Sequence, residues 1–285
     1  MKYITYSDMA ATIRRNIWKV PHDVDLIVGI PRSGMIAALM IGELMHKRVA
    51  DIGSFLSGHT LGYGGRGSHI QETPIKKVLL VDDTVFNGNA MFLASKYVEP
   101  VKDKYIILTA CIYAEGRNAK DMVNIYFEDI YDPHETLYLY EWNILHHHEH
   151  KTKLFMFDMD GVLCKEPPDE RYVMAYEEYL PNAIPMVVPT TIIGAIVTYR
   201  MDKYRDVTDD WLKRYGIEYG ELCMINDYAR KYYSSPATYK ADIYRSAEWA
   251  QLFIESDPFQ APVIGRLSKK PVYCYDNNIM YTYKL

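Results

Sequence analysis

Two segments of this 285-residue chain share one pattern, in which a short apolar run leads directly into two closely spaced aspartates and then a glycine. The two segments are residues 78–88 and residues 154–161. Short apolar runs beside turn residues are typical of buried strands, and in parallel sheets ligands bind beyond the carboxyl ends of the strands. The pattern therefore predicts an α/β protein with one candidate site in each half of the chain.

The length of the chain indicates two domains, since a domain averages ~150 residues. We interpret the histidine-rich residues 146–150 as a solvated linker rather than a metal-binding tract, because adjacent histidines in a linker seldom converge on one ion. The predicted domains are residues 1–148 and residues 149–285. Apolar runs alternate with helical patterns in both halves, so each domain is expected to be a doubly wound parallel sheet with crossover helices.

The same patterns place the main elements. In the first domain they predict strands at residues 25–30, 77–81 and 105–113, and helices at residues 33–46 and 88–97. They also predict an amphipathic helix within residues 1–19, capped by Ser7. In the second domain they predict strands at residues 153–157, 192–197, 251–254 and 271–275, and a helix at residues 206–215. The glycine-rich residues 53–74 are expected to form a long flexible loop.

Composition excludes several classes of protein. A net charge of -5 without a run of lysine or arginine argues against a nucleic-acid-binding surface. No apolar run approaches the ~20 residues that span a bilayer, so no transmembrane segment is expected. The four scattered cysteines lack metal-binding or redox spacing, which favours a cytoplasmic location. These cysteines are Cys111, Cys164, Cys223 and Cys274.

The first candidate site centres on Asp82 and Asp83, which the sequence places at the end of a strand. Two adjacent carboxylates can accept hydrogen bonds from the two hydroxyls of a ribose, directly or through Mg²⁺. The turn at Gly88 leads into a helix, whose free N–H groups favour a phosphate. The pattern therefore indicates a pocket for a ribose phosphate.

Residues 78–91 resemble the motif with which type I phosphoribosyltransferases bind 5-phosphoribosyl 1-diphosphate (PRPP), and the resemblance covers about residues 1–145. Residues 28–34 are similar to the pyrophosphate loop of that family, and residues 53–74 lie where the family has a mobile catalytic hood. The resemblance implies displacement of pyrophosphate from the sugar C1 by an acceptor. The residues that it assigns to PRPP are Arg32, Ser33, Gly34, Arg66, Asp82, Asp83, Thr84, Val85, Phe86, Asn87, Gly88 and Asn89.

The chain departs from this family in ways that concern the acceptor. Phe86 stands where the purine-using members carry an acid, which disfavours a purine acceptor. The hood lysine of the orotate branch has no counterpart, although Arg66 lies in the corresponding loop. A sugar hydroxyl as acceptor needs a base to take its proton. Glu115, His59 and His69 are all candidates for that base.

The second candidate site resembles that of the haloacid dehalogenase (HAD) superfamily of phosphatases. Four elements occur in the order of that superfamily: residues 158–162, residues 197–200, Lys240 and residues 254–257. The resemblance implies that Asp158 attacks phosphorus and that Asp160 protonates the leaving group and then activates water. Lys240 and Thr198 orient the phosphoryl group, and the insertion at residues 165–191 is a small cap. Mg²⁺ is expected on Asp158, the Asp160 carbonyl, and Glu255 or Asp257.

Together the two resemblances predict a bifunctional enzyme that transfers 5-phosphoribose from PRPP to an acceptor and then removes the 5-phosphate. The chain resembles fusions of this kind that act as ribofuranosyltransferases in bacterial polysaccharide synthesis, so a glycan hydroxyl is the favoured acceptor. Two alternatives stay open: a heterocyclic base as the acceptor, and a PRPP-sensing regulator. A homo-oligomer is compatible with the sequence.

Overall fold

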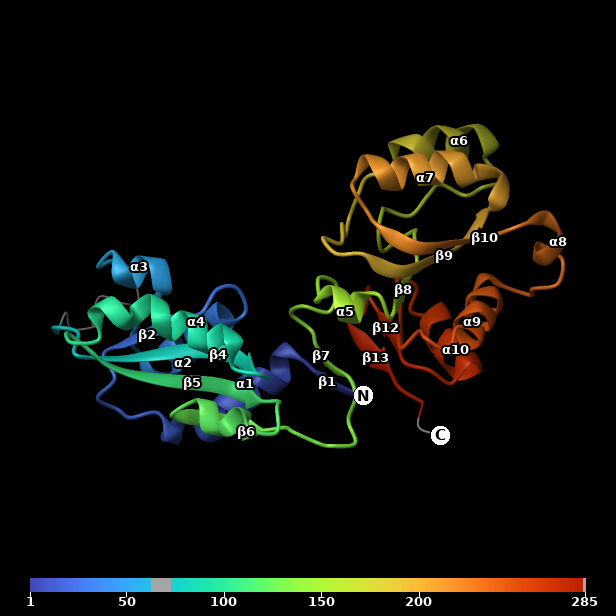
Figure 1. The fold of residues 1–285 in the computed structure, drawn as a ribbon. Coiled ribbons are helices and arrows are strands. Elements are labelled where there is room, and N and C mark those ends of the chain that lie inside the picture. Colours follow the sequence, from blue (N-terminus) through green and yellow to red (C-terminus); the bar gives the residue numbers. More distant parts are fainter. Residues whose placement is uncertain (63–72, 284–285) are drawn as a thin grey trace. The chain divides into compact units, whose positions relative to one another are not determined.

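The computed structural model describes residues 1–62 and 73–283 and divides into two compact units, Met1–Asn143 and Ile144–Leu285 (Figure 1). Both units have the predicted α/β architecture, in which a parallel sheet is combined with helices. Residues 63–72 of the predicted loop at residues 53–74 lie outside the described residues, and these include Arg66 and His69. Its first residues belong to a short helix, α3 (Ile52–Leu56).

The first unit contains a five-stranded sheet in the order β3-β2-β4-β5-β6, in which every pairing is parallel. Its strands are β2 (Leu26–Gly29), β3 (Arg48–Asp51), β4 (Lys77–Val85), β5 (Ile106–Ala114) and β6 (Ile125–Asp129). Its longer helices are α1 (Tyr6–Asn16), α2 (Gly34–Met45) and α4 (Asn89–Val98). Single 3₁₀ turns occur at Ile17–Lys19, Glu99–Val101 and Ala119–Met122.

Helices cover both faces of this sheet, because side chains along each buried strand alternate between two cores. Ile27 and Leu79 face the core that contains α1 and α2. Leu26 and Leu80 face the opposite core, which contains residues of α3 and α4. In Figure 1, α4 accordingly lies over one face of the sheet and α1 and α2 over the other. Both faces are thus buried, and the carboxyl edge of the sheet is left for a site.

A separate two-stranded parallel ribbon completes the first unit. It pairs β1 (Lys2–Ile4) with β7 (Tyr138–Tyr140). The cap of the following helix α1 is Thr5, whose hydroxyl accepts a hydrogen bond from the Asp8 N–H, while Asp8 accepts one from the Thr5 N–H. The prediction of Ser7 as the cap is wrong, because this reciprocal capping box satisfies two free N–H groups at once.

The second unit contains a six-stranded sheet in the order β10-β9-β8-β11-β12-β13, and only the β12–β13 pairing is antiparallel. Its strands are β8 (Phe155–Phe157), β9 (Ile193–Met201), β10 (Tyr219–Ile225), β11 (Leu252–Glu255), β12 (Val272–Cys274) and β13 (Ile279–Tyr281). Its helices are α5 (Glu149–Thr152), α6 (Val173–Asn182), α7 (Arg205–Arg214), α8 (Asp227–Arg230), α9 (Pro236–Ser246) and α10 (Gln260–Ser268), with a 3₁₀ turn at Asp202–Tyr204. Figure 1 shows α6 and α7 on one side of the sheet and α9 and α10 on the other.

Two strands are longer than the sequence predicts, and both extensions concern site residues. Strand β4 continues through Val85, so Asp82 and Asp83 lie within the strand rather than after it. Asp82 and Thr84 still pair with β5, which shows that the polar residues extend the ladder. Strand β9 likewise continues to Met201 and includes Thr198.

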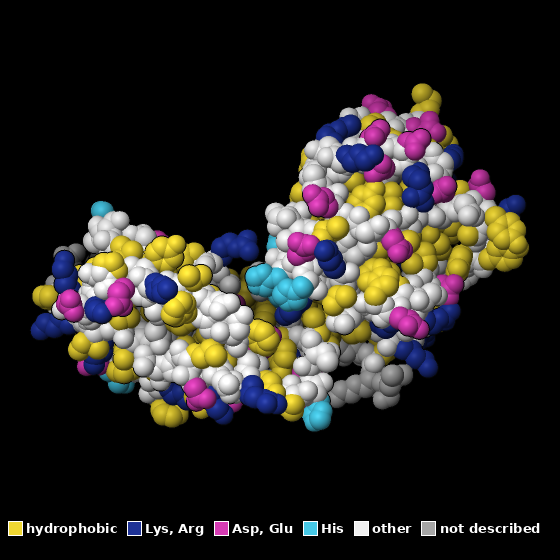
Figure 2. All heavy atoms as spheres, in the orientation of Figure 1, with side chains coloured by type: hydrophobic (Ala, Val, Ile, Leu, Met, Phe, Trp, Pro, Cys, Tyr) yellow, Lys and Arg dark blue, Asp and Glu magenta, His cyan; other side chains and the backbone are white. Residues whose placement is uncertain are grey.

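The surface of each unit is mixed in charge. On the face drawn in Figure 2, basic and acidic side chains are interspersed. Over the whole chain 37 acidic residues stand against 32 lysines and arginines. Within the described residues, no helix is both long and apolar enough to cross a bilayer.

Candidate functional sites

The first site is built around Asp83, a buried carboxylate near the end of β4. One oxygen accepts a hydrogen bond from the Ser33 hydroxyl at 2.9 Å. The other accepts one from the indole N–H of Trp142 at 2.6 Å. Both oxygens are thus held by donors from distant parts of the unit, which fixes the orientation of the carboxylate.

Asp82 lies in a different electrostatic environment from its neighbour. Its carboxylate accepts a hydrogen bond from the Asp83 N–H at 3.0 Å, and the side chain is buried. Burial, and then the charge of Asp83, raise the pKa of Asp82 to about 8. The pair therefore retains a proton near neutral pH, and a cation or several hydroxyl donors could replace that proton.

Replacing Asp82 with asparagine is expected to stabilise the protein at alkaline pH. Because the folded pKa lies above the unfolded value, Asp82 favours folding below pH ~4 and loses that contribution as the pH rises to about 8. The gain of Asp82→Asn over native protein should grow by about 2 to 4 kcal/mol between pH 5 and pH 8. Urea unfolding at both pH values measures the difference. A gain that does not change with pH would contradict the assigned pKa.

The loop before α2 approaches this carboxylate pair closely. Gly34 opens the helix, and a Cβ at this position would lie 2.8 Å from the Val81 carbonyl oxygen and 3.0 Å from Oδ1 of Asp82. Only glycine fits this contact without a shift of the strand. Arg32 is exposed beside it, where its guanidinium can reach a ligand at the edge of the sheet.

The turn that follows Asp83 leads into α4. Thr84 and Val85 close strand β4, and the Phe86 side chain beyond them is 64% exposed. The side chain of Asn87 accepts a hydrogen bond from the N–H of Asn89 at 3.2 Å. Gly88 caps the helix with a φ of 75°, a conformation that favours glycine. The first N–H groups of α4 therefore face the same edge of the sheet as the acids.

Tyr140 and Trp142 belong to this site, and the sequence analysis did not identify either of them. Tyr140 donates a hydrogen bond to the buried Glu115 at 2.5 Å, and Trp142 donates to Asp83. Their rings lie 5.0 Å apart, and the Tyr6 ring lies 5.7 Å from Trp142. The segment containing β7 is thereby fixed to one carboxylate near the end of β4 and to another just after β5, its neighbour in the sheet.

The candidate bases differ in their surroundings. Glu115 follows β5 directly, on the same edge of the sheet as Asp83. Burial is the main cause that raises the pKa of Tyr140 well above its usual value, and the charge of Glu115 is the next. That shift keeps Tyr140 protonated as a donor to Glu115. His59 is exposed, and its backbone N–H donates a hydrogen bond to the Ser54 carbonyl.

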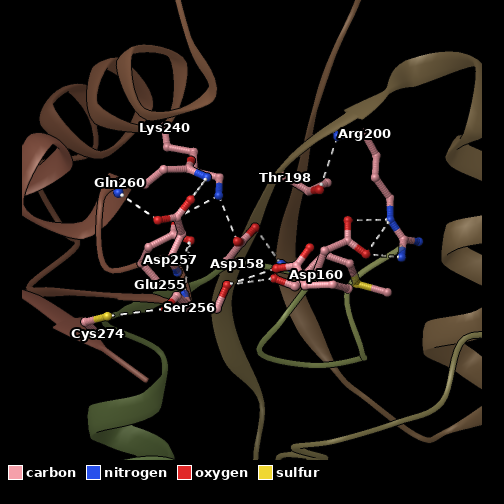
Figure 3. A network of polar contacts seen from close by, with 12 residues as sticks. Asp158, Asp160, Thr198, Arg200, Lys240, Glu255, Ser256, Asp257, Gln260 and Cys274 are labelled. Atoms are coloured by element: carbon pink, nitrogen blue, oxygen red, sulfur yellow. Dashed lines mark hydrogen bonds and ion pairs between the residues drawn. The ribbon is translucent and has the colours of Figure 1, made fainter. Parts of the chain in front are cut away.

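The second site is built around Lys240, a buried lysine on α9. Its ammonium lies 2.7 Å from Oδ2 of Asp158 and 2.7 Å from Oε2 of Glu255, as Figure 3 shows. Asp158 follows β8, Glu255 ends β11, and the two strands are neighbours. Parallel strands thus bring residues far apart in sequence to one edge of the sheet.

One lysine does not balance two buried carboxylates. Burial, and then the charge of Glu255, raise the pKa of Asp158 well above its usual value, although Lys240 acts in the opposite direction. Burial alone would lower the pKa of Lys240, but the two carboxylates outweigh it and keep the ammonium protonated. The site is therefore able to take up a further positive charge.

The donor atoms here fit Mg²⁺, which prefers oxygen and is usually bound by one or two carboxylates together with water. Asp158, Glu255 and the Asp160 carbonyl offer such a set, and the Asp160 carbonyl is held by the Ser256 hydroxyl at 3.2 Å. Within the described part of the chain, no three side chains of His, Cys, Asp or Glu converge as metal ligands. Asp257 points instead at the start of α10, where it accepts hydrogen bonds from the Phe259 N–H and the Gln260 side chain.

Asp160 forms an ion pair with Arg200, which belongs to the segment 197–200 but received no role in the sequence analysis. The guanidinium of Arg200 contacts both carboxylate oxygens, at 2.9 Å from Oδ2 and 2.5 Å from Oδ1 (Figure 3). Arg200 is buried within β9, two residues after Thr198. The Thr198 hydroxyl accepts a hydrogen bond from the Arg200 N–H at 3.2 Å. An arginine is seldom buried without a carboxylate partner, but nothing local to Arg200 indicates which one.

These residues border a pocket of about 320 Å³. Asp158, Thr198 and Lys240 lie within it, and Tyr176 of the inserted segment forms part of its wall. The other residues that line it are Asp160, Glu166, Pro167, Pro168, Asp169, Glu170, Tyr199, Arg200, Pro236 and Gln260. The arrangement places a carboxylate, a lysine and a threonine around one cavity, which suits a tetrahedral anion.

Several solved structures are similar to part of this chain. A xanthine-guanine-hypoxanthine phosphoribosyltransferase from Helicobacter pylori is 15% identical, with a TM-score of 0.37, over 50% of this chain and 93% of its own. An orotate phosphoribosyltransferase from Aeropyrum pernix is 14% identical, with a TM-score of 0.33, over 44% and 70%. A purine phosphoribosyltransferase from Pyrococcus horikoshii Ot3 is 18% identical, with a TM-score of 0.33, over 50% and 94%.

No protein-family model and no curated protein matches the chain. Because every TM-score given above is below 0.5 and every identity is below 20%, we base the function on the residues of the chain itself.

Proposed function

We propose that this chain transfers 5-phosphoribose from PRPP to an acceptor and then hydrolyses the 5-phosphate, so that the net reaction is ribosyl transfer. The observation that carries the proposal is the presence of two acid-rich sites at the strand ends of two parallel sheets, one built on Asp83 and one on Asp158. The sequence motifs around them resemble those of a phosphoribosyltransferase and a HAD phosphatase. A ribose phosphate is the natural product of the first chemistry and substrate of the second.

In the transfer step, the bond between the ribose C1 and the pyrophosphate oxygen breaks, and a bond from C1 to the acceptor forms. Asp82 and Asp83 would accept hydrogen bonds from the ribose hydroxyls, and Arg32 would bind the departing pyrophosphate. Mg²⁺, when bound, would add charge neutralisation to the pyrophosphate. The acceptor loses a proton if it is a hydroxyl, and Glu115, buried and oriented by Tyr140, is the base that we favour.

In the hydrolysis step, a carboxylate oxygen of Asp158 attacks phosphorus, and the bond from phosphorus to the sugar oxygen breaks. Asp160 would give its proton to the leaving oxygen and then accept one from the water that cleaves the aspartyl-phosphate. Arg200 would hold Asp160 in place between the two steps. Lys240 and Thr198 would neutralise and orient the phosphoryl oxygens. Mg²⁺, when bound, would offset part of the negative charge of the site.

We favour a hydroxyl of a glycan, as in bacterial surface polysaccharide synthesis, over a heterocyclic base as the acceptor. A nitrogen acceptor brings its own lone pair, whereas a hydroxyl needs a base to take its proton. Glu115 lies at the carboxyl edge of the sheet, where Tyr140 orients it by a hydrogen bond. Phe86 is exposed on the turn after Asp83, where it offers no proton donor to a purine.

Blocking the second step should reveal the first. We expect the full-length Asp158→Asn variant, given PRPP, Mg²⁺ and candidate acceptors, to accumulate a phosphoribosyl adduct, because its nucleophile is gone. Native protein should convert the same acceptor to a ribosyl adduct. Mass spectrometry of the products distinguishes the two by one phosphate.

The choice of acceptor decides between the remaining readings. Parallel reactions with an oligosaccharide and with heterocyclic bases show which one is modified. If native protein and the variant give the same product, the two-step reaction is wrong. If both bind PRPP but neither forms any adduct, the chain is better explained as a PRPP-sensing regulator.

A further inference from the structure

The pocket of the second unit is strongly acidic for a site that handles phosphate. Five carboxylates line it, those of Asp158, Asp160, Glu166, Asp169 and Glu170, against two cations. Both cations are already paired, Lys240 with Asp158 and Glu255, and Arg200 with Asp160. The lining therefore has no spare positive charge for a second phosphate group.

Of the three outer carboxylates of the pocket, those of Glu166, Asp169 and Glu170, the Glu166 carboxylate is held beside the turn that carries Asp160. The Ser256 hydroxyl lies 3.3 Å from Oε1 of Glu166 and 3.2 Å from the Asp160 carbonyl oxygen. A Cβ built on Gly161 would lie 2.5 Å from the same Glu166 oxygen. The Glu166 carboxylate is thus held against the turn between Asp160 and Gly161.

Two ion pairs offset part of this negative charge. Glu170 forms an ion pair with Arg230, whose guanidinium lies 5.2 Å above the ring of Tyr199. Asp169 likewise forms an ion pair with Arg171. Arg230 and Arg171 are therefore paired with carboxylates that line the pocket, and neither is free for a phosphate of a substrate.

The rest of the wall is uncharged and suits a sugar. Tyr176 and Tyr199 contribute ring surface, and three prolines contribute C–H surface. Aromatic rings pack well against the C–H faces of a pyranose or furanose, and outer carboxylates accept hydrogen bonds from hydroxyls. A polyhydroxyl leaving group can use both, whereas a polyanion is repelled by the same carboxylates.

We propose that this pocket selects phosphate monoesters whose leaving group is an uncharged polyhydroxyl compound and rejects esters that carry further phosphates, PRPP among them. The inference rests on the proposed function, and it adds a consequence. PRPP carries the same 5-phosphate as the transfer product, so a phosphatase without this selectivity would destroy the donor before its pyrophosphate is displaced. Glu166 and Glu170 are then specificity-determining residues that act by charge repulsion.

The test compares orthophosphate release from ribose 5-phosphate and from PRPP by the full-length chain at equal free Mg²⁺. We expect kcat/KM for ribose 5-phosphate to exceed that for PRPP by at least tenfold, on the order expected for a few like charges at short range in water. Raising the ionic strength from about 0.1 M to about 1 M shortens the Debye length from about 10 Å to about 3 Å and should reduce the ratio.

Single substitutions identify the carboxylates responsible. Glu166→Gln removes one repulsive charge, and Glu170→Gln also frees Arg230 to meet a phosphate, so each should lower the ratio several-fold, with the larger effect for Glu170→Gln. The matched control is Glu178→Gln, an exposed acid on α6 that does not line the pocket, which should leave the ratio unchanged.

The outcomes separate the two proposals. If ribose 5-phosphate and PRPP are hydrolysed equally, the selectivity is refuted while the phosphatase stands. If the ratio is high but does not respond to Glu166→Gln and Glu170→Gln, charge repulsion by these carboxylates is refuted as its cause. If no phosphate monoester is hydrolysed at all, the proposed function of this unit fails first.

Discussion

Replacing Lys240 with methionine is expected to lower the free energy of unfolding of the second unit by about 3 to 5 kcal/mol and to abolish hydrolysis of phosphate esters. Breaking a buried ion pair from one side costs this much because the remaining charge is left without a partner. Here Asp158 and Glu255 are both buried against the same ammonium, at 2.7 Å each. Urea unfolding of the full chain measures the loss, and hydrogen exchange of the β8 and β11 amides assigns it to this unit.

The matched control is Lys213→Met. Lys213 pairs with Asp209 on the surface of α7 with its side chain 69% exposed, and such pairs contribute about 0.3 to 0.5 kcal/mol. The deficit of Lys240→Met should also shrink as the pH falls, because the raised pKa of Asp158 lets this carboxylate take up a proton, and less buried negative charge is then left without a partner. A loss similar to that of Lys213→Met, or one that does not depend on pH, would mean that Lys240 does not hold the two carboxylates together.

Replacing Asp83 with asparagine is expected to lower the rate at which the PRPP-derived adduct forms by on the order of 10²- to 10³-fold. A loss of this size is typical when one precisely placed polar group of a site is removed. Asp83 is held from both sides by Ser33 and Trp142, so its orientation is fixed before a ligand arrives. An amide keeps the shape but can accept only on one side. Hydrolysis of a simple aryl phosphate by the second unit should be unaffected, and mass spectrometry and phosphate release read the two activities separately.

Two further variants test the cause. Trp142→Phe keeps the ring contacts but removes the donor to Asp83, so a smaller loss of the adduct is expected, through weaker binding of PRPP. Asp103→Asn, at an exposed acid away from the site, should behave as native protein. Loss of both activities in Asp83→Asn would show that the two units do not act independently. Unchanged adduct formation would remove Asp83 from the site.

The sequence predicted the strands that hold the sites, because buried strands have a clear apolar signal, but it did not predict helix α9, which carries Lys240. It placed the ends of β4 and β9 too early. Asp82 and Asp83 have little strand propensity and are held in the ladder by pairing with β5, and the apolar run of β9 ends at Val197 although the strand continues through Thr198 and Arg200. Among the strands that the sequence did not predict are β1, β7 and β13, each of three residues. Runs that short carry no period of their own and form only where a partner strand is already in place.

The contacts between distant side chains were beyond prediction for a different reason. Trp142 lies 59 positions from Asp83, and Arg200 lies 40 positions from Asp160. Nothing local to either residue indicates the partner, since a tryptophan or an arginine is found in many environments. By contrast, Lys240 could be assigned from its order among the motifs.

The hydrogen bond from Trp142 to Asp83 gives the first site an optical readout of its own. Indole emission responds to the charge that its N–H faces, and this N–H faces the carboxylate proposed to meet the sugar. A ligand that draws Asp83 toward its hydroxyls would alter the fluorescence of one tryptophan among the four in the chain. Binding of PRPP to the first site could then be followed in real time without a label, even in a variant that does not catalyse the transfer.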